Sequence, residues 1–408
     1  MKRRNFIHTL NLGIASSILL NSDLYAKSIF TLGSNPQDVE LSYHRIQEIR
    51  FSNVRMQYPR LVGKNARLDI HGYGPRVDAC VIYTDKGAIG WASLRGSVRG
   101  AQEIAKELIG KKVSEVFIPA VGIIDQKYIP FDAALHDLAG IILKKPVYAL
   151  LGQRTPILTK YYSGMIYFDD LEPTQSPGGI DQILKNCQQD YDFGYRQFKV
   201  KIGRGNRWMS YREGLKRDIE VTKTIAESFP NCDILVDGNN GFSAKEFTDY
   251  LKGIAGVNLF WIEEPFHETV AEYTYLRNWI KNEGINTLLA DGEADANQDL
   301  VMELLQKKLI DVHLTDIEEL GFTNWRKLMP KLQQMGSLAS PHAWGSLLKT
   351  HYIAQLSGGL GNTVTIEGVT SSSDDVDLSG YKIIKGQLVP PSTPGFGMPL
   401  LKKIIVVR

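Results

Sequence analysis

The feature that most constrains the fold is a regular alternation of strand-like and helix-like segments from residue 158 onward. Short apolar runs, rich in β-branched and aromatic residues, are separated by longer amphipathic stretches. The candidate strands cover residues 160–165, 197–202, 233–237, 259–263, 287–291, 311–315, 337–340 and 363–366. Eight strands with helices between them, within about 210 residues, meet the requirement of a (β/α)8 barrel.

An open, doubly wound sheet is the main alternative for such an alternation. That fold favours a glycine-rich phosphate loop after its first strand. No G-x-G-x-x-G motif follows a candidate strand, because the run Gly203-Arg204-Gly205 lacks the third glycine. We therefore favour the barrel.

The chain ahead of the barrel has a different pattern. Residues 46–62 and 78–91 predict antiparallel strands, with the turn Asp85-Lys86-Gly87 between apolar runs, and helical stretches follow at 101–109 and 131–143. We expect three parts after the N-terminus. They are an α+β capping domain over residues 42–157, the barrel over 158–370, and a C-terminal tail over 371–408 that returns to the cap.

The first 26 residues have the pattern of an export signal. A basic start, Lys2-Arg3-Arg4, precedes an apolar run at 10–20, and the small residue Ala26 follows. The paired arginines with Phe6 resemble a twin-arginine signal, and an ordinary Sec signal is the alternative. The apolar run is too short to span a bilayer core of about 30 Å, so we expect no stable membrane anchor. The mature protein is predicted to be periplasmic or otherwise exported.

The composition is that of an ordinary soluble globular protein. Lys and Arg number 47 and Asp and Glu number 45, which gives a formal net charge of +2. This balance gives no reason to expect a nucleic-acid partner, because proteins that bind nucleic acid carry basic patches. The three cysteines, Cys80, Cys187 and Cys232, cannot form a disulfide framework.

Acidic or histidine residues recur where the candidate strands end, and barrel active sites lie at the carboxyl ends of the strands. They are Asp237, Glu263, Glu293, Asp316, His342 and Glu367, at intervals of 23 to 30 residues. The first three come from successive strands and would repel one another unless a cation neutralises them. An all-oxygen set suits Mg²⁺. Two alternatives remain: each acid could pair with a nearby Lys or Arg, and Asp291 could replace Glu293 as a ligand.

Two lysines and a histidine could supply acid–base chemistry. Lys199 and Lys201 lie on one face of their strand, where each would depress the pKa of the other and make one a usable base. The alternative is an exposed basic edge. Asp316 lies within reach of His342 and would fix its tautomer. Glu367 lies beside that space and could donate a hydrogen bond if it were protonated.

Together these residues resemble the enolase superfamily, in its mandelate racemase subgroup. The motifs that carry the resemblance are Lys199-x-Lys201, Asp237-x-Asn239, Trp261-Ile262-Glu263-Glu264-Pro265, Gly292-Glu293, Asp316, Pro341-His342, the runs 131–140 and 145–152, and Pro394-Gly395-Phe396-Gly397. The resemblance covers residues 42 to the end, although the cap strand ends in Gly90-Trp91-Ala92-Ser93 where the family more often has an acid.

The resemblance implies an α/β protein with a modified TIM barrel, (β/α)7β, under an α+β cap completed by the tail. It implies Mg²⁺ on Asp237, Glu263 and Glu293, and two opposed acid–base groups, Lys201 and the His342–Asp316 dyad. Lys199 would neutralise the substrate carboxylate, Glu367 would hydrogen-bond the enolate, and Asn239 would lie near the metal-bound carboxylate. A homo-oligomer is also expected.

The implied reaction is abstraction of the proton beside the carboxylate of a small acid. Our leading hypothesis is dehydration of a polyhydroxy monocarboxylate, an acid sugar, to a 2-keto-3-deoxy acid. Basic and hydroxyl-bearing cap residues favour such a substrate: Arg55, Arg60, Lys64, Arg67, His71 and Tyr73. The alternatives are a racemase, epimerase or cycloisomerase with the same enolate step, a Schiff-base aldolase that uses Lys201, and a non-catalytic binding protein for acid sugars.

Overall fold

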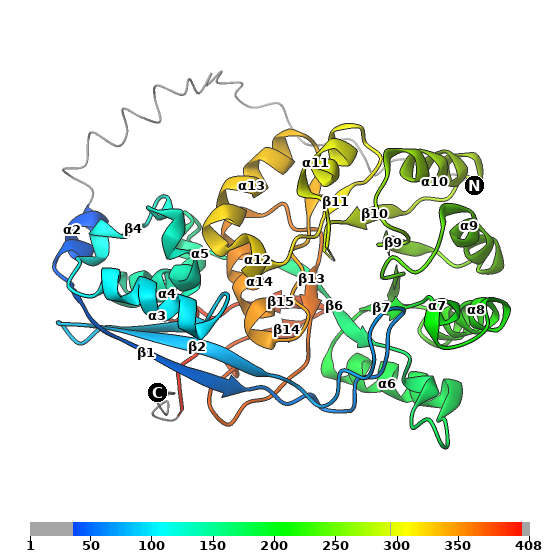
Figure 1. The fold of residues 1–408 in the computed structure, drawn as a ribbon, viewed down its shortest axis with the longest axis horizontal. Coiled ribbons are helices and arrows are strands. Elements are labelled where there is room, and N and C mark those ends of the chain that lie inside the picture. The colour runs from blue at the N-terminus through cyan, green and yellow to red at the C-terminus, as the bar shows by residue number, and fades with distance from the viewer. Residues whose placement is uncertain (1–35, 294, 402–408) are drawn as a thin grey trace.

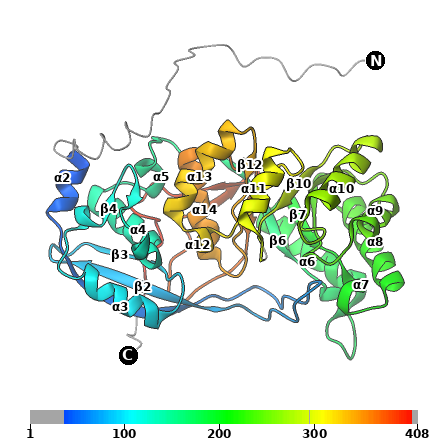
Figure 2. The same cartoon turned by 45° about the horizontal axis from the view of Figure 1, so that its top comes forward.

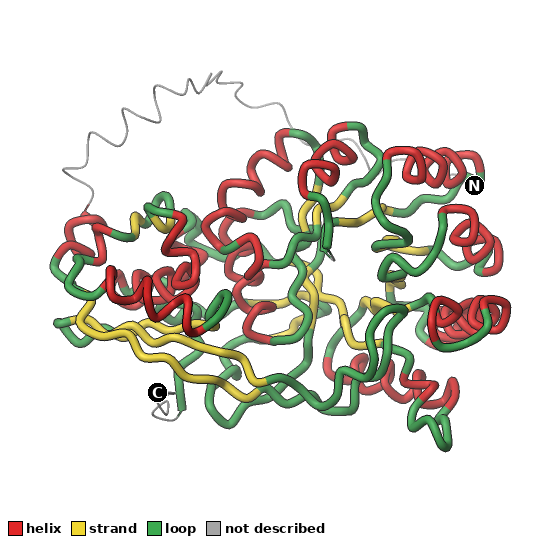
Figure 3. The backbone as a smooth tube through the Cα atoms, in the orientation of Figure 1, coloured by secondary structure: helices red, strands yellow, loops and turns green. Residues whose placement is uncertain are grey.

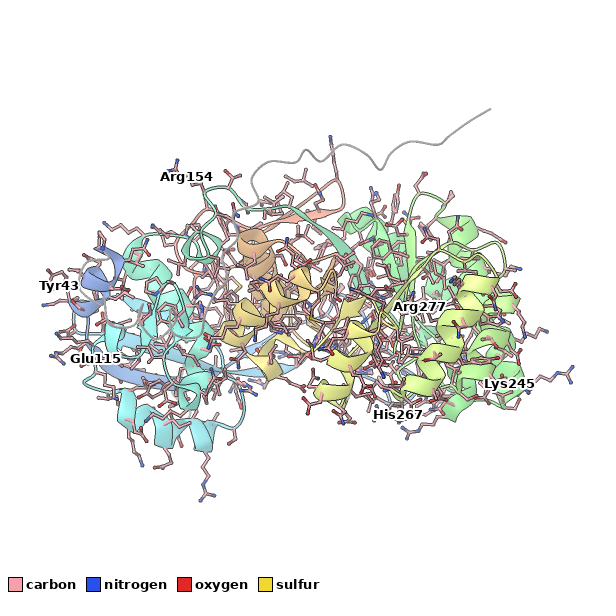
Figure 4. All side chains as sticks on the ribbon, turned by 90° about the horizontal axis from the view of Figure 1, so that it is seen from above. Tyr43, Glu115, Arg154, Lys245, His267 and Arg277 are labelled. Carbon is pink, nitrogen blue, oxygen red and sulfur yellow. The ribbon has the colours of Figure 1, made fainter. Side chains whose placement is uncertain are left out.

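The structure, a computed structural model, describes residues 36–293 and 295–401. The predicted export signal lies outside these residues. Figure 1 shows two regions side by side, a cap built around a long antiparallel sheet and a barrel surrounded by helices. In Figure 4, Tyr43 and Glu115 mark the cap end of the long axis and Lys245 marks the barrel end. Within the described residues, no helix has the length and apolarity to cross a membrane.

The cap consists of a three-stranded antiparallel sheet with helices on it. Its strands, in order, are β1 (Ile46–Arg55), β2 (Arg76–Thr84) and β3 (Ile89–Ser93), and β4 (Phe117–Ile118) and β5 (Gly122–Ile123) form a separate pair. Its helices include α2 (Pro36–Ser42), α3 (Val98–Leu108), α4 (Asp132–Leu143) and α5 (Val147–Leu150). Helix α4 approaches β3 so closely that a Cβ at Gly90 would lie 2.5 Å from Leu138, which explains a glycine there.

The C-terminal tail returns to the cap, as expected. The Phe396 amide donates to Asp137 Oδ1 at 2.7 Å, and the Trp91 indole donates to the Met398 carbonyl at 2.7 Å. Before that, β14 (Lys382–Ile384) and β15 (Gln387–Val389) form a hairpin that pairs with the start of the first barrel strand.

The second region is a barrel of parallel strands. They are β6 (Thr159–Ile166), β7 (Gln197–Lys201), β8 (Asp233–Asp237), β9 (Leu259–Glu263), β10 (Leu288–Asp291), β11 (Val312–His313), β12 (Leu338–Ala339) and β13 (Ile366–Gly368). Each strand pairs with its neighbour from β6 to β12, and β13 pairs with β6. Ala339 of β12 also bridges Thr363, just ahead of β13, so the ring closes.

Long helices connect successive strands on the outside of the barrel (Figures 2 and 3). They are α6 (Gly179–Phe193), α8 (Tyr211–Ser228), α9 (Ala244–Gly253), α10 (Val270–Asn282), α11 (Gln298–Gln306), α13 (Phe322–Gln334) and α14 (Leu347–Leu360), with short α7 (Arg204–Arg207) and α12 (Ile317–Leu320). The chain after β13 returns to the cap. The predicted (β/α)7β barrel with an α+β cap is therefore confirmed.

Strand alternation places the charged residues inside the barrel. On β7, Phe198 and Val200 pack into the large apolar core, whereas Lys199 and Lys201 point to the interior and are 0% and 3% exposed. A separate apolar cluster fills the interior below them: Tyr162, Leu235, Trp261, Ala290, Val312 and Leu314. The alternative of an exposed basic edge is therefore wrong.

Candidate active site

Three carboxylates meet at the carboxyl end of the barrel. Asp237 ends β8 and pairs in register with Glu263, which ends β9, and Glu293 follows β10 by two residues. One oxygen from each lies within 4.8 Å of the others. Within the described part of the chain, Glu263 Oε2 and Glu293 Oε2 are buried and have no hydrogen-bond partner. Such an all-oxygen cluster with buried, unpartnered oxygens fits a hard cation such as Mg²⁺.

Asp291 does not join this cluster. The chain turns at Gly292, whose φ of +117° ends the strand alternation, so Asp291 and Glu293 do not face the same way. The Asp291 carboxylate accepts hydrogen bonds from the Tyr273 hydroxyl and the Gly292 amide. Burial raises its pKa to about 8. Of the two acids, the structure therefore brings Glu293 to the cluster.

Both lysines of β7 contact these carboxylates. Lys199 Nζ lies 2.7 Å from Glu263 Oε1, 2.9 Å from Glu367 Oε1 and 3.4 Å from Asp237 Oδ2. Lys201 Nζ forms an ion pair with Asp237 Oδ2. Burial lowers the pKa of each lysine, but the neighbouring carboxylates outweigh it and raise both. We expected each lysine to lower the pKa of the other, and the shift is in the opposite direction. The expectation considered only the repulsion between the two lysines and not the attraction of the acids around them.

His342 lies among three acids. Its Nδ1 is 3.0 Å from Asp316 Oδ2, and its Nε2 is 3.0 Å from Glu293 Oε1 and 3.5 Å from Glu367 Oε2. Burial lowers the pKa of His342, but these carboxylates raise it well above its ordinary value. These contacts favour the protonated form of the ring.

The Asp316 carboxylate is held by backbone amides of α12 as well as by His342. It caps α12, since its Oδ1 accepts from the amides of Glu318 and Glu319. Lys349 Nζ lies 2.8 Å from the same Oδ2 that faces His342. Burial raises the pKa of Asp316, but the hydrogen bond from His342 and the Lys349 charge lower it to about 2. Sequence reasoning missed Lys349, because nothing in its motif indicates that the first turn of α14 faces this acid.

Glu367 and Asn239 complete the predicted set. Glu367 lies on β13 and accepts a hydrogen bond from the Ala343 amide at 2.8 Å. Burial raises its pKa, but the charges of Lys199 and His342 outweigh this and lower it, which favours the ionised form over the protonated donor that we considered. The Asn239 amide donates to Asp237 Oδ1 at 2.9 Å, and within the described residues its side-chain oxygen is buried without a partner.

These groups open onto a cavity of about 390 Å³ between the barrel and the cap. Lys201 and His342, the two predicted acid–base groups, both line it. The other lining residues are Asn65, Arg67, Leu68, His71, Tyr167, Asn239, Glu293, Asp295, Asp316, Glu319, Trp344 and Lys349.

Few of the cap residues that we expected to face a substrate do so. Of those six cap residues, only Arg67 and His71 line the cavity. Arg60 instead pairs with Asp190, and Lys64 with Glu172, at 2.7 and 2.6 Å. Arg55 and Tyr73 are not among the lining residues.

Ser93, at the end of cap strand β3, contacts an acid of the barrel. The Ser93 hydroxyl donates a hydrogen bond to the Glu318 carboxylate. Glu318 in turn lies 3.9 Å from Lys349 Nζ. A chain of polar contacts therefore links the end of β3 to Asp316 and His342.

Comparison with known proteins agrees with this geometry. The family described as Enolase C-terminal domain-like matches residues 182–404, which include all the strand-end residues described above. A D-gluconate/D-galactonate dehydratase of Picrophilus torridus is 25% identical over 280 residues, which cover 67% of this chain and 69% of that protein. Other relatives are named as a cycloisomerase and an epimerase.

Solved structures give a higher similarity. A galacturonate dehydratase from Geobacillus sp., complexed with D-galacturonate and 5-keto-4-deoxy-D-galacturonate, is 31% identical with a TM-score of 0.82, and covers 88% of this chain and 95% of that one. A mutant of that dehydratase complexed with Mg has the same identity and TM-score, over 88% and 93% of the two chains.

Proposed function

The chain belongs to the enolase superfamily, in the mandelate racemase/muconate lactonizing enzyme family, and on that premise we propose that it dehydrates an acid sugar to a 2-keto-3-deoxy acid. The observation that carries the proposal is that Lys201 and the His342–Asp316 dyad line one cavity next to the carboxylate cluster. An acid–base group on each side of a bound acid allows one to take a proton while the other returns one.

We propose that Asp237, Glu263 and Glu293 hold Mg²⁺. Their unpartnered buried oxygens support this, and a dehydratase with 31% identity was solved with Mg. When bound, the ion supplies charge stabilisation for a substrate carboxylate that becomes doubly anionic.

In the proposed reaction, Lys201 Nζ takes the proton from the carbon beside the substrate carboxylate. The ion pair with Asp237 favours the charged form of Lys201. A cation held by Asp237 would offset the charge of that carboxylate and so lower the pKa of Lys201 towards that of a usable base. His342, fixed by Asp316, donates a proton to the leaving hydroxyl, which departs as water. The resulting enol then takes a proton at the carbon that lost the hydroxyl and gives up its O–H proton, which yields the 2-keto-3-deoxy acid. Lys199 balances the substrate carboxylate, and Glu367 keeps Lys199 and His342 in position.

A racemase, epimerase or cycloisomerase is the second candidate, because the same enolate step precedes each of these reactions. The relatives named as a cycloisomerase and an epimerase favour it. A Schiff-base aldolase has less support, because its chemistry makes no use of the carboxylate cluster or of the His342–Asp316 dyad. A non-catalytic binding protein would leave two acid–base groups in the cavity without a purpose.

A panel of acid sugars tests the proposal. D-galactonate, D-gluconate, arabinonate and D-galacturonate are incubated with the Mg²⁺-loaded protein in deuterated water. Dehydration predicts a semicarbazide-reactive product from an aldonate, or a new methylene signal by NMR from the uronate. Proton exchange without water loss would instead favour the isomerase alternatives. If no panel member shows either proton exchange or water loss, both the dehydratase proposal and the isomerase alternatives are contradicted.

We also propose that the protein is exported and assembles as a homo-oligomer. The twin-arginine-like start, Arg3-Arg4, supports export. Replacing both arginines with lysine is expected to retain the precursor inside the cell, and cell fractionation measures this. Light scattering on the purified protein is expected to give a multiple of the chain mass.

A further inference from the structure

The cap loop at residues 63–67, between β1 and β2, is tied to the barrel along its backbone. Its first two residues contact the loop after β6. The Gly63 amide donates to Asp169 Oδ1 at 2.6 Å, and the Lys64 carbonyl accepts from the Phe168 amide at 2.9 Å. The Lys64 ammonium also pairs with Glu172 at 2.6 Å. This end of the loop is therefore fixed by both backbone and side chain.

The next three carbonyls of the loop accept hydrogen bonds from three consecutive side chains at the end of α7. Three adjacent backbone groups are thus held by one short segment of the barrel. The pairs are Asn65 O with Trp208 Nε1 at 2.6 Å, Ala66 O with Asn206 Nδ2 at 2.9 Å, and Arg67 O with Arg207 Nη1 at 2.6 Å.

Packing reinforces these hydrogen bonds. Ala66 is fully buried, and its methyl group lies against two glycines of the barrel. A Cβ at Gly203 would lie 2.8 Å from the Ala66 Cβ, and one at Gly241 would lie 3.1 Å from it. The loop therefore rests directly on the barrel backbone, where a larger side chain at Gly203 would push it away.

This loop brings cap side chains to the cavity. Asn65 Oδ1 accepts from the Arg67 and Leu68 amides at 2.9 and 2.6 Å, which shapes the turn before Arg67. His71 Nδ1 donates to the Gly63 carbonyl at 2.8 Å. Since burial lowers the pKa of His71, its ring is neutral and Nε2 is left as an acceptor. Arg67 thus offers donors to the cavity and His71 offers an acceptor.

The same segment of the barrel carries Lys201. Figures 1 and 2 show the chain between β1 and β2 extending from the cap to the barrel beside β7 and α7. Lys201 ends β7, and the side chains that hold the loop follow at Asn206 to Trp208. A shift of α7 would move the loop together with the residues next to Lys201.

We propose that loop 63–67 is a fixed wall of the substrate cavity, and that Asn206, Arg207 and Trp208 are positioning residues that set where Arg67 and His71 meet the substrate. The inference rests on the proposed function only in taking this cavity as the substrate site. Because the wall is fixed before binding, the ordering of the loop adds no entropic cost when substrate binds.

Hydrogen–deuterium exchange of the Mg²⁺-loaded protein tests the wall. The Gly63, Arg67 and Leu68 amides are hydrogen-bonded when the loop is docked, so peptides over residues 60–72 are expected to exchange slowly in the wild type. The double variant Asn206→Leu/Trp208→Phe removes two of the three side-chain donors. It is expected to exchange at least about tenfold faster in that segment, with an unchanged circular dichroism spectrum.

A kinetic readout tests positioning, using the panel member with the highest kcat/KM. The double variant is expected to raise KM by about tenfold and to change kcat by less than about threefold, since the wall binds substrate and transition state alike. Trp91→Phe is the matched control: it removes an indole–carbonyl bond of 2.7 Å at the cap–tail contact and should leave both readouts unchanged.

Fast exchange over residues 60–72 in the wild type, or equal exchange in wild type and double variant, would overturn the fixed wall. Faster exchange with an unchanged KM would overturn the positioning role. If the wild type turns over no acid sugar, the proposed function fails, whereas the exchange experiment still decides whether the wall exists.

Discussion

The barrel side and the cap side of the cavity hold their side chains in place by different means. On the barrel side, charged groups at strand ends hold one another: Lys199 contacts Glu263 and Glu367, and His342 contacts Glu293. On the cap side, hydrogen bonds to the backbone hold a loop, and that loop carries Arg67 into the cavity.

This difference separates two kinds of failure. Loss of one charge on the barrel side leaves a buried partner unpaired and changes the protonation of its neighbours. Loss of one contact on the cap side moves a wall and leaves the reacting groups intact. We therefore expect variants of the charged strand-end groups to lower kcat, and variants of the cap loop or of the side chains that hold it to raise KM.

The largest effect is expected from the two acid–base groups. Lys201→Ala and His342→Asn should each lower kcat by at least about a thousandfold, because each removes a positioned proton carrier. Steady-state turnover of the panel substrate measures this. Lys252→Ala, which removes an exposed lysine paired with Asp249, is the control. Full turnover in either site variant would remove that residue from the proposed reaction.

A somewhat smaller effect is expected on metal affinity. Glu263→Gln should weaken Mg²⁺ binding by at least about a hundredfold, since even groups next to metal ligands typically contribute ten- to a hundredfold. Calorimetric titration with Mg²⁺ measures the affinity, with Glu272→Gln, a half-buried residue in the first turn of α10, as control. Unchanged Mg²⁺ affinity would exclude Glu263 as a ligand.

Asp316→Asn tests the support of His342. We expect kcat to fall by about a hundredfold, with little change in KM, because the ring loses its anionic partner at Nδ1.

The same variant should also change the acid stability. The pKa of Asp316 is lowered to about 2, below the ordinary value of about 3.9, so its contacts stabilise the fold above that ordinary value. This stability is lost as pH falls through the lowered pKa. The difference in Tm between wild type and Asp316→Asn should therefore shrink as the pH is reduced from 7 to 2. A constant difference would contradict the assigned pKa direction.

The smallest effects are expected at Arg67 of the cap and at its ion-pair partner Asp295. Arg67→Gln should raise KM by about tenfold and leave kcat nearly unchanged, through loss of charged donors to the substrate. Asp295→Asn should change KM by less than about twofold, because its ion pair with Arg67 joins side chains that are 83% and 34% exposed. A large fall in kcat in either variant would contradict the account in which the strand-end groups set kcat and the cap loop affects KM.

The predictability of the two sides differs for a physical reason. Strand ends in a barrel are placed by the period of the strands, so the sequence pattern was sufficient to bring Asp237, Glu263 and Asp316 to one mouth. The backbone turn at Gly292, which separates Asp291 from Glu293, breaks that period and was not visible in the residue spacing. The pKa directions of Lys199 and Lys201 also required the positions of the acids, which the spacing did not supply.

The cap loop could not be placed from its sequence. Arg60 and Lys64 carry the same positive charge as Arg67, yet they pair with Asp190 and Glu172 and do not line the cavity. Arg67 follows Ala66, which packs against Gly203, and the sequence alone does not indicate this contact between residues far apart in the chain.

Chelation tests the central claim most directly, namely that a cation on Asp237, Glu263 and Glu293 makes proton removal beside a carboxylate possible. The folded protein is freed of metal with EDTA, and deuterium exchange and water loss are followed on the panel substrate. We predict that both are lost and that both return when Mg²⁺ is restored. Full turnover by the metal-free, folded protein would contradict the account.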